Sequence, residues 1–596
     1  MRAPQRAEAG MAAHPAQGGL PLAWYLLGSA AVLAVIGLGI GLPLTAGHDL
    51  RFAYPWLDYF STLVRQGELY PRWLPMTWGG AGSTDFFFYA PLPYWLGSPF
   101  TLWMGTADAL RAAATMAWLG SAALFFAAFQ PLIRHHAAAA AGALIYALLP
   151  YHLVVDWIER TALAEFAAYL WGPPLVAGLI RLAQGAPRAM LWVSLATAGI
   201  LLTHLPSALI LATAAVVLCP ALALTVSGWR ARGTFAGRAV LAAGLGAALA
   251  APYWLPAVTL THWVPAQEFM YWDYYRWPGW LMFSNAPSPN APWLARLETV
   301  FLQTIAIAGL GVLSGVIARL VYRRRVGPAA RVWLAAGLMT ALASWLLTAP
   351  GQPLWQTLTI LERLQFPWRF LLLLDLGAAM LAALGLAALA HGSTRGKWAA
   401  AAVLAAGLAI SAWQETDLVR RQLSTLGPDQ WRDLEQRVAL GLAPWEWLTH
   451  EQRAYMDRLY RSRGLDRAPL DRRLARAYAA LPPVQSLPSR SLKDPVVQRH
   501  SARHLTARFT LRHPARVTLR QGFWPLWRAR DLATGATVEL LPDPRTGLVA
   551  MSLPAGKTVL DLRLTHHWTE RAGVAAAMVA AALLLAWLWR RRRAAS

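Results

Sequence analysis

The chain has 596 residues, of which 57% are hydrophobic and only 14% are charged, and its mean hydropathy is +0.36. Soluble domains carry about 25% charged residues, so this composition excludes a soluble globular enzyme and indicates an integral membrane protein. The formal net charge is +24, but no nucleic-acid-binding motif accompanies it. We attribute much of this charge to basic loops on one side of a membrane, and membrane lipids, not nucleic acid, are the expected partners. The remainder is mostly Arg in the domain between Trp413 and Arg571, where it could face anionic head groups or an anionic ligand. The only cysteine, Cys219, lies in a hydrophobic run, which excludes an intramolecular disulfide and a cysteine-based zinc site.

Apolar runs define the first expectation about the fold. Residues 1–19 are rich in Ala, Gly and Pro and predict a disordered cytoplasmic tail. The apolar run that follows is long and lacks a small-residue cleavage motif, so we expect an uncleaved signal-anchor helix. Runs of roughly 18 to 20 apolar residues predict about twelve membrane spans in all. We place them near 22–44, 110–130, 137–153, 164–183, 189–204, 206–226, 239–258, 297–319, 332–348, 370–391, 398–413 and 572–589.

Basic residues in the short loops predict the orientation of these spans. With a cytoplasmic N-terminus, every strong basic cluster falls on the cytoplasmic side, as the positive-inside rule requires. The clusters are Arg134, Arg181 with Arg188, Arg230 with Arg232 and Arg238, Arg323–Arg325, Arg395 with Lys397, and Arg590–Arg593. This orientation requires the proline-rich stretch 91–107 to be interfacial or re-entrant; as a true crossing it would need a compensating error elsewhere. We therefore expect a multi-pass protein of the bacterial cytoplasmic membrane with both termini in the cytoplasm.

Three parts follow from this orientation. Residues 20–413 form a membrane body with a large outer loop at 46–109, residues 414–570 form an outer, periplasmic domain, and residues 571–596 form the last membrane helix and a cytoplasmic Arg tail. Within the outer domain, charged and apolar residues mix at helical spacing up to Ala480. Alternating apolar and polar residues then predict antiparallel strands at 505–511, 516–520, 537–540, 548–553 and 558–564. The expected fold is mainly α, a polytopic helical membrane protein with an outer α+β domain that ends in a small β-sandwich.

The outer loop contains the first candidate site residues, His48 and Asp49. A carboxylate just beyond a span could act as a base toward an acceptor hydroxyl or help to hold a divalent metal, because both roles need localised negative charge. His48 could then be a second ligand or a proton relay. Both residues could equally cap the helix that begins at residue 50.

Two further outward-facing stretches carry unusual charges. The stretch 151–165 contains Asp156, Glu159, Arg160 and Glu165. The Arg160 guanidinium offers a planar fork for a phosphate or carboxylate, and Glu165 at the start of a span is costly unless it is paired or functional. A structural Arg–Glu pair that closes the interface is the alternative.

The third stretch, 364–370, contains Arg369 beside Trp368. Arg369 could contact the phosphate of a lipid-linked ligand, although an interfacial Arg beside Trp is also a common membrane anchor. Asp375, deeper in the same span, is expected to pair with another helix. His204, in the tight outer turn between two spans, could line the same cleft or act as a hydrogen-bonded structural histidine.

Five motifs support a family resemblance. They are Gly47-His48-Asp49, Pro71-Arg72-Trp73, Phe88-Tyr89-Ala90-Pro91-Leu92, Glu159-Arg160-Thr161-Ala162-Leu163-Ala164-Glu165 and Gln365-Phe366-Pro367-Trp368-Arg369. Together they resemble bacterial polytopic membrane proteins labelled "6-pyruvoyl-tetrahydropterin synthase-related". The label implies no pterin chemistry, because pterin synthases are soluble enzymes with a histidine zinc site and this sequence has no such histidine cluster.

The predicted architecture is also similar to the GT-C class of glycosyltransferases. In that class an outer-facing Asp of the first loop assists the acceptor or a metal, and the sugar arrives on a polyprenyl phosphate. The resemblance implies Asp49 as the catalytic carboxylate with His48 beside it, and Arg160 or Arg369 at the donor phosphate. Asp156, Glu159, Glu165 and His204 would line the cleft.

The implied activity is transfer of a sugar from a polyprenyl-phosphate carrier to an envelope acceptor on the outer face. Many members of the class have a paired acidic motif in the first loop, whereas the neighbour of Asp49 here is His48. A transfer without a metal is therefore the simpler expectation, and a divalent metal remains an open alternative. A second hypothesis is a non-catalytic transporter or assembly factor for envelope lipid or polysaccharide that uses the same cleft for binding.

Overall fold

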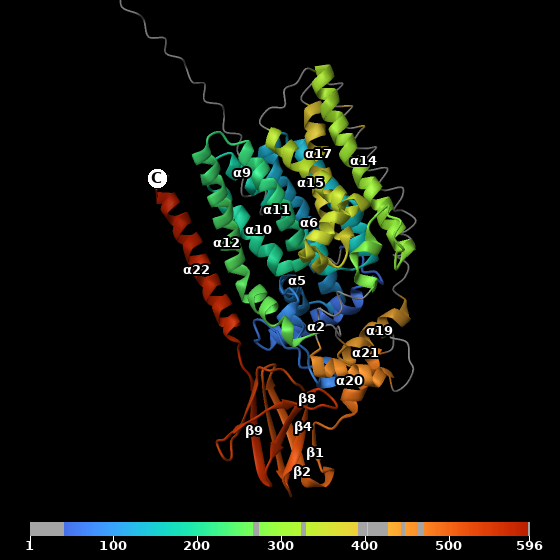
Figure 1. Ribbon diagram of the computed structural model, residues 1–596, viewed down its shortest axis with the longest axis vertical. Coiled ribbons are helices and arrows are strands. Elements are labelled where there is room, and N and C mark those ends of the chain that lie inside the picture. Colours follow the sequence, from blue (N-terminus) through green and yellow to red (C-terminus); the bar gives the residue numbers. More distant parts are fainter. Residues whose placement is uncertain are drawn as a thin grey trace, which may run out of the picture. The chain divides into compact units, whose positions relative to one another are not determined.

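The computed structural model describes residues 41–265, 273–322, 329–390, 398, 402, 427–442, 448–461 and 470–593 (Figure 1). The predicted tail 1–19 lies outside these residues. So do most of the predicted first span, 22–44, and of the predicted span 398–413.

Within the described residues, nine helices are long and apolar enough to cross a membrane. Each of the nine matches a predicted span, so the prediction of a mainly helical multi-pass membrane protein is confirmed. They are α6 (Thr106–Ile133), α7 with η2 (His136–Leu148 and Tyr151–Glu159), α8 with α9 (Leu163–Ala168 and Gly172–Ala183), α11 (Leu205–Leu224), α12 (Trp229–Thr259), α14 (Ala291–Tyr322), α15 (Ala330–Leu347), η8 with α17 (Pro367–Phe370 and Leu371–Ala390) and α22 (Trp568–Arg593). A further apolar helix, α10 (Ala189–Thr203), is shorter.

Among the described spans, α17 is the most deeply buried: its membrane-spanning window is entirely buried, and it packs against α7, α14 and α15. Figure 1 shows it beside α14 and α15. A helix surrounded by other helices can be apolar on every side, which explains its lack of a polar face. Glycine lets the neighbours approach closely: a Cβ on Gly385 would lie 2.4 Å from the carbonyl oxygen of Gly311 on α14. The one acidic residue of α17, Asp375, accepts hydrogen bonds from the hydroxyls of Tyr169 at 2.8 Å and Thr304 at 3.2 Å.

The first loop is folded around aromatic side chains. It contains α2 (Leu50–Arg65), α3 (Thr77–Gly80), α4 (Asp85–Phe88), α5 (Leu92–Gly97) and η1 (Ser98–Leu102). Trp56, Phe60, Phe86 and Tyr94 form edge-to-face and tilted ring contacts with centroids 4.8 to 6.0 Å apart. The proline-rich stretch 91–107 contains only α5, η1 and the start of α6; six helical residues span about 9 Å, too little to cross a membrane.

Short helices make up several other connections. They are η3 (Thr261–Trp263), η4 (Asp273–Tyr275), η5 (Trp277–Trp280), η6 (Ala349–Gly351), α16 (Gln352–Thr357), η7 (Thr359–Leu364) and η10 (Ser489–Ser491).

The C-terminal domain begins with α19 (Pro428–Ala439), α20 (His450–Arg461) and α21 (Leu470–Ala480), as the helical spacing predicted. Two antiparallel sheets follow, in the orders β1-β4-β8-β7 and β2-β3-β9-β5-β6. Their strands are β1 (Val484–Leu487), β2 (Leu492–Ser501), β3 (His504–Leu511), β4 (Ala515–Gly522), β5 (Trp527–Asp531), β6 (Thr537–Val538), β7 (Leu541–Pro542), β8 (Leu548–Leu553) and β9 (Gly556–Leu564). All five predicted strands are present.

The inner faces of the two sheets share one apolar core, which makes the domain a β-sandwich and confirms the predicted antiparallel domain. Residues of the first loop join this core: Trp73 packs edge-to-face on Trp527 at 5.8 Å, and Phe87 lies 5.5 Å from Trp524. The sandwich and the first loop therefore stabilise each other.

Glu570, in the first turn of α22, forms a second connection between these parts. Its carboxylate is 3.1 Å from Arg72 Nε in the first loop and 3.3 Å from Arg503 Nη2 beside β3. It also lies 3.0 Å from His566 Nδ1. The Arg72 and Glu570 side chains are only 5% and 4% exposed, so this ion pair is buried.

Candidate functional site

The site begins where the segment before α2 lies against the segment after η2. The backbone nitrogens of His48 and Asp49 donate hydrogen bonds to the carbonyl oxygens of Glu159 at 3.3 Å and Arg160 at 2.7 Å. The Trp157 indole donates to the carbonyl oxygen of Pro43 at 2.8 Å. These bonds bring two of the three charged stretches of the sequence into direct contact.

Gly47 makes this approach possible. A Cβ at position 47 would lie 2.4 Å from the carbonyl carbon of Arg160 and 2.4 Å from Thr161 Oγ1. No other residue type fits there without a backbone shift. Thr161 itself has a φ of +58°, a conformation that a β-branched residue rarely adopts, and it ends the helical path of the chain just after Arg160.

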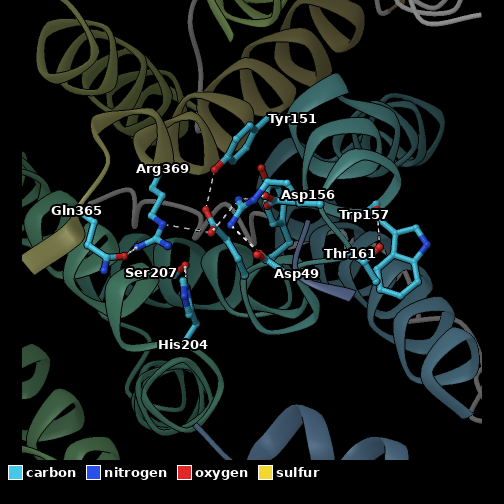
Figure 2. Close-up of polar contacts among 12 residues, drawn as sticks. Asp49, Tyr151, Asp156, Trp157, Thr161, His204, Ser207, Gln365 and Arg369 are labelled. Carbon is cyan, nitrogen blue, oxygen red and sulfur yellow. Dashed lines mark hydrogen bonds and ion pairs between the residues drawn. The ribbon is translucent and has the colours of Figure 1, made fainter. Parts of the chain in front are cut away.

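Arg160 holds three carboxylates. Its Nη1 lies 2.7 Å from Asp156 and 3.0 Å from Glu165, and its Nη2 lies 3.3 Å from Asp49 (Figure 2). Asp156 belongs to η2, a nine-residue π-helix, which is a rare form of helix that often occurs at functional sites. The Arg160 side chain is only 9% exposed, so all three interactions are largely shielded from water.

Glu165 extends the same network toward the third stretch. One carboxylate oxygen accepts a 2.6 Å hydrogen bond from the Tyr151 hydroxyl, and the other lies 3.0 Å from Arg160 Nη1 and 3.3 Å from Arg369 Nε. Buried charges are stable only when they are paired and hydrogen-bonded, and Glu165 meets this condition with three partners. We call Asp49, Tyr151, Asp156, Arg160, Glu165 and Arg369 the Arg160 network.

Arg369 is held from one side. Its Nη1 donates to the carbonyl oxygen of Leu364 at 2.8 Å and to Gln365 Oε1 at 3.3 Å, and its Nε faces Glu165. Gln365 has a φ of +64°, and the turn that it makes places η8 and its arginine beside the network. Nη2 of Arg369 forms no hydrogen bond or ion pair with any residue in the described part of the chain.

Asp49 is the accessible carboxylate of the network. Its side chain is 39% exposed, whereas those of Asp156 and Glu165 are 0% and 2% exposed. Asp49 occupies the N-cap position of α2, but its side chain makes no capping hydrogen bond there. One oxygen, Oδ2, is held by Arg160, and the other makes no bond to a residue that the structure describes.

Three of the predicted site residues have other contacts. The exposed ring of His48 lies 5.4 Å from the Trp293 ring, and Glu159 pairs with Arg296 of α14 at 3.1 Å. His204, in the turn between α10 and α11, hydrogen-bonds Ser207 at 2.8 Å through Nδ1 (Figure 2). Burial lowers the pKa of His204, so its imidazole is neutral near pH 7.

Sequence reasoning missed two members or neighbours of this site. The sequence analysis assigns no role to Tyr151 within the charged stretch 151–165, yet its hydroxyl donates a hydrogen bond to Glu165. The second is Tyr89 in the first loop: burial raises the pKa of its phenol, the charge of Asp49 raises it further, and Arg369 has an opposing effect. Its position in the Phe88-Tyr89-Ala90-Pro91-Leu92 motif was the available signal.

A metal site is not formed by the described side chains. Over the described ranges, no three His, Cys, Asp or Glu residues are grouped so that they could hold a metal ion. The carboxylates that come together at the network are instead paired with arginine.

No protein-family model matches the chain, and no curated protein matches its sequence, so the resemblance to the "6-pyruvoyl-tetrahydropterin synthase-related" proteins stays a prediction. Among solved structures, the chain is similar to ArnT from Cupriavidus metallidurans bound to undecaprenyl phosphate, with 15% identity, a TM-score of 0.44, and 77% of this chain and 75% of that chain covered. For ArnT in the apo state the identity is 13% and the TM-score is 0.37, with 77% of this chain and 68% of that chain covered. For the arabinofuranosyltransferase AftD from Mycobacteria the identity is 15% and the TM-score is 0.39, with 71% of this chain but only 29% of that chain covered. These likenesses are too remote to assign an activity to this chain.

Proposed function

We propose that this chain is a membrane glycosyltransferase that moves a sugar from a polyprenyl-phosphate carrier to an envelope acceptor, with Asp49 as the catalytic base. The observation that supports it is the state of Asp49: it is the partly exposed carboxylate of an otherwise buried network. Arg160 fixes its Oδ2, and its Oδ1 makes no bond to a residue that the structure describes. A general base must be both oriented and accessible to the proton that it accepts.

The proposed reaction has one displacement step. Asp49 accepts the proton of an acceptor hydroxyl, the hydroxyl oxygen attacks the anomeric carbon of the sugar, and the bond from that carbon to the carrier phosphate oxygen breaks. The polyprenyl phosphate leaves with the bonding electron pair, so negative charge increases on its phosphate. A guanidinium beside that phosphate lowers the barrier by stabilising the developing charge.

Of the two candidate arginines, we assign the phosphate to Arg369. Both terminal nitrogens of Arg160 are occupied by carboxylates, whereas Nη2 of Arg369 has no partner among the described residues. Arg160 is then a positioning residue, which fixes Asp49 and pairs with Asp156 and Glu165. The role of His48 as a proton relay has less support, because no hydrogen bond joins its side chain to Asp49 in the described structure.

The test separates binding from transfer in purified protein in nanodiscs. Native mass spectrometry with undecaprenyl phosphate measures carrier binding, and a panel of radiolabelled polyprenyl-phosphate sugars with envelope fractions measures transfer. We expect Asp49→Asn to bind the carrier normally and to lose at least 100-fold in transfer rate, in the range of general-base contributions of roughly 10² to 10⁴. We expect Arg369→Ala to lose carrier binding.

Arg363→Ala is the matched control, because Arg363 is an exposed cation of the same segment. It should leave both quantities unchanged. Normal transfer by Asp49→Asn would rule out the proposed base. Carrier binding by the wild type without transfer of any sugar, unchanged in Asp49→Asn, would favour the transporter or assembly-factor hypothesis.

A further inference from the structure

The outward face of the five-stranded sheet is strongly basic. In β3, β9 and β5 alternate residues point into the sandwich core, so the others point outward. The outward positions include five exposed cations and one carboxylate, Asp561. The cations are Arg508, Arg528, Arg530, Lys557 and Arg563.

Strand register places these charges against one another. Arg528 of β5 is the direct cross-strand partner of Arg563 of β9. Like charges directly opposite on neighbouring strands destabilise a sheet, so folding alone does not account for this pair. Arg530 is opposite Asp561, but that carboxylate already contacts His504 at 2.5 Å and Arg563 at 2.8 Å.

Arg563 is therefore paired with Asp561, whereas the other four cations have no carboxylate partner among the residues that the structure describes. Arg508 and Lys557 form no ion pair with a residue in the described part of the chain. Arg528 and Arg530 donate to backbone carbonyl oxygens of Pro525 and Gly535, at 2.8 and 2.9 Å, which holds them without neutralising them. Strands lie about 4.8 Å apart and same-face neighbours about 7 Å apart, so the cations form a closely spaced array.

We propose that this face of the sheet binds a polyanionic glycan, a polymer that carries phosphate or carboxylate groups at short intervals. Each exposed ion pair contributes little to binding, so one small anion would bind weakly. A polymer that engages several cations at once gains affinity by multivalency. The outward threonines of β3, Thr506 and Thr510, can add hydrogen bonds to sugar hydroxyls.

The side of the membrane on which the sandwich lies favours a glycan over a nucleic acid as the polyanion. α22 connects the sandwich to Arg590–Arg593, and the positive-inside rule puts such a cluster in the cytoplasm, so the sandwich faces the envelope, where nucleic acid is absent. A membrane surface fits less well, since segments that lie on a bilayer insert aromatic side chains and the outward positions of β3, β9 and β5 hold none. This proposal does not depend on the proposed transferase activity.

The experiment measures binding of fluorescent polygalacturonate, with neutral dextran as the uncharged comparison, to the full-length protein in nanodiscs. The test variant combines Arg508→Gln, Arg528→Gln and Arg563→Gln. The charge-matched control combines Arg432→Gln, Arg476→Gln and Arg545→Gln, which are exposed arginines away from this face. We expect at least tenfold weaker binding and a smaller salt dependence in the test variant, and wild-type binding in the control.

Three results would overturn the proposal: no binding of polygalacturonate by the wild type, equal losses in the two triple variants, or equal binding of neutral dextran. A parallel measurement uses vesicles with 30% anionic phospholipid. Binding of the vesicles without binding of polygalacturonate would identify the face as a membrane-contacting surface instead.

Discussion

The backbone nitrogen of Asp49 donates a 2.7 Å hydrogen bond to the carbonyl oxygen of Arg160, and the same two residues form an ion pair through Oδ2 and Nη2 at 3.3 Å. They are 111 positions apart in the chain. Because both the backbone and the side chain of Asp49 bind Arg160, the position of the Asp49 carboxylate is set by the membrane helices and not by its own loop. Preorganisation of this kind is what a base needs to act without reorganising during the reaction.

Gly47→Ala tests the close approach that makes this pairing possible. The added methyl group meets backbone atoms of residues 160 and 161, so we expect a shift of the segment and a loss of stability of about 1–3 kcal/mol. Transfer activity should fall more than tenfold because Asp49 moves. Gly105→Ala is the control, since a Cβ there meets nothing within 4 Å and its φ of −64° suits any residue. Equal thermal midpoints and activities for the two variants would contradict the argument.

Arg160→Ala tests whether Arg160 neutralises the buried carboxylates. The change leaves Asp156 without a countercharge at 0% exposure, and we expect a destabilisation of about 3–5 kcal/mol in thermal unfolding in nanodiscs. Asp49→Asn removes a partly exposed charge and should cost less than about 1 kcal/mol. Arg432→Ala, which breaks an exposed ion pair with Asp429, sets the baseline. A small effect of Arg160→Ala, similar to that of Arg432→Ala, would show that the network does not stabilise the fold.

His204 should make stability depend on pH. Burial lowers its pKa in the folded state, whereas in the unfolded state the pKa is near 6.5. The unfolded state therefore binds more protons below about pH 6.5, and the stability present above that pH is lost as the pH falls. We expect the thermal midpoint of the wild type to fall more between pH 7.5 and pH 5 than that of His204→Gln. His500→Gln, at an exposed histidine, should keep the wild-type pH dependence of the thermal midpoint. If His500→Gln weakened this pH dependence as much as His204→Gln, the cause would be a general effect of charge and not the buried imidazole.

Local hydrophobic pattern was sufficient for most of the fold. The membrane helices could be predicted because each is a long apolar run, and β3 and β9 because every second residue is buried. β2 was missed because its ten residues are almost all exposed and include Pro495. β5 was missed because two of its buried positions are Ala529 and Asp531, which give no apolar signal.

The site was predictable only as a set of charged stretches. The sequence indicated that Asp49, Arg160 and Arg369 should lie at one face, but ion-pair partners depend on contacts between distant segments. Glu159 and Arg160 are neighbours in the chain, yet one pairs with Arg296 of α14 and the other with Asp49. The π-helix at Tyr151–Glu159 also escapes prediction, because over nine residues its apolar pattern does not differ from that of an α-helix.

Glu570→Gln tests the connection between the first loop, the sandwich and α22. The amide keeps the size of the side chain but removes the charge that compensates Arg72, whose side chain is 5% exposed. We expect a loss of about 3–5 kcal/mol and faster limited proteolysis of the sandwich. Glu68→Gln is the matched control, because Glu68 also pairs with Arg503, a partner of Glu570, at 3.5 Å but is 25% exposed. Its substitution should therefore cost less than about 1 kcal/mol. If Glu68→Gln and Glu570→Gln lower the thermal midpoint equally, the buried Arg72–Glu570 pair is not what holds these parts together.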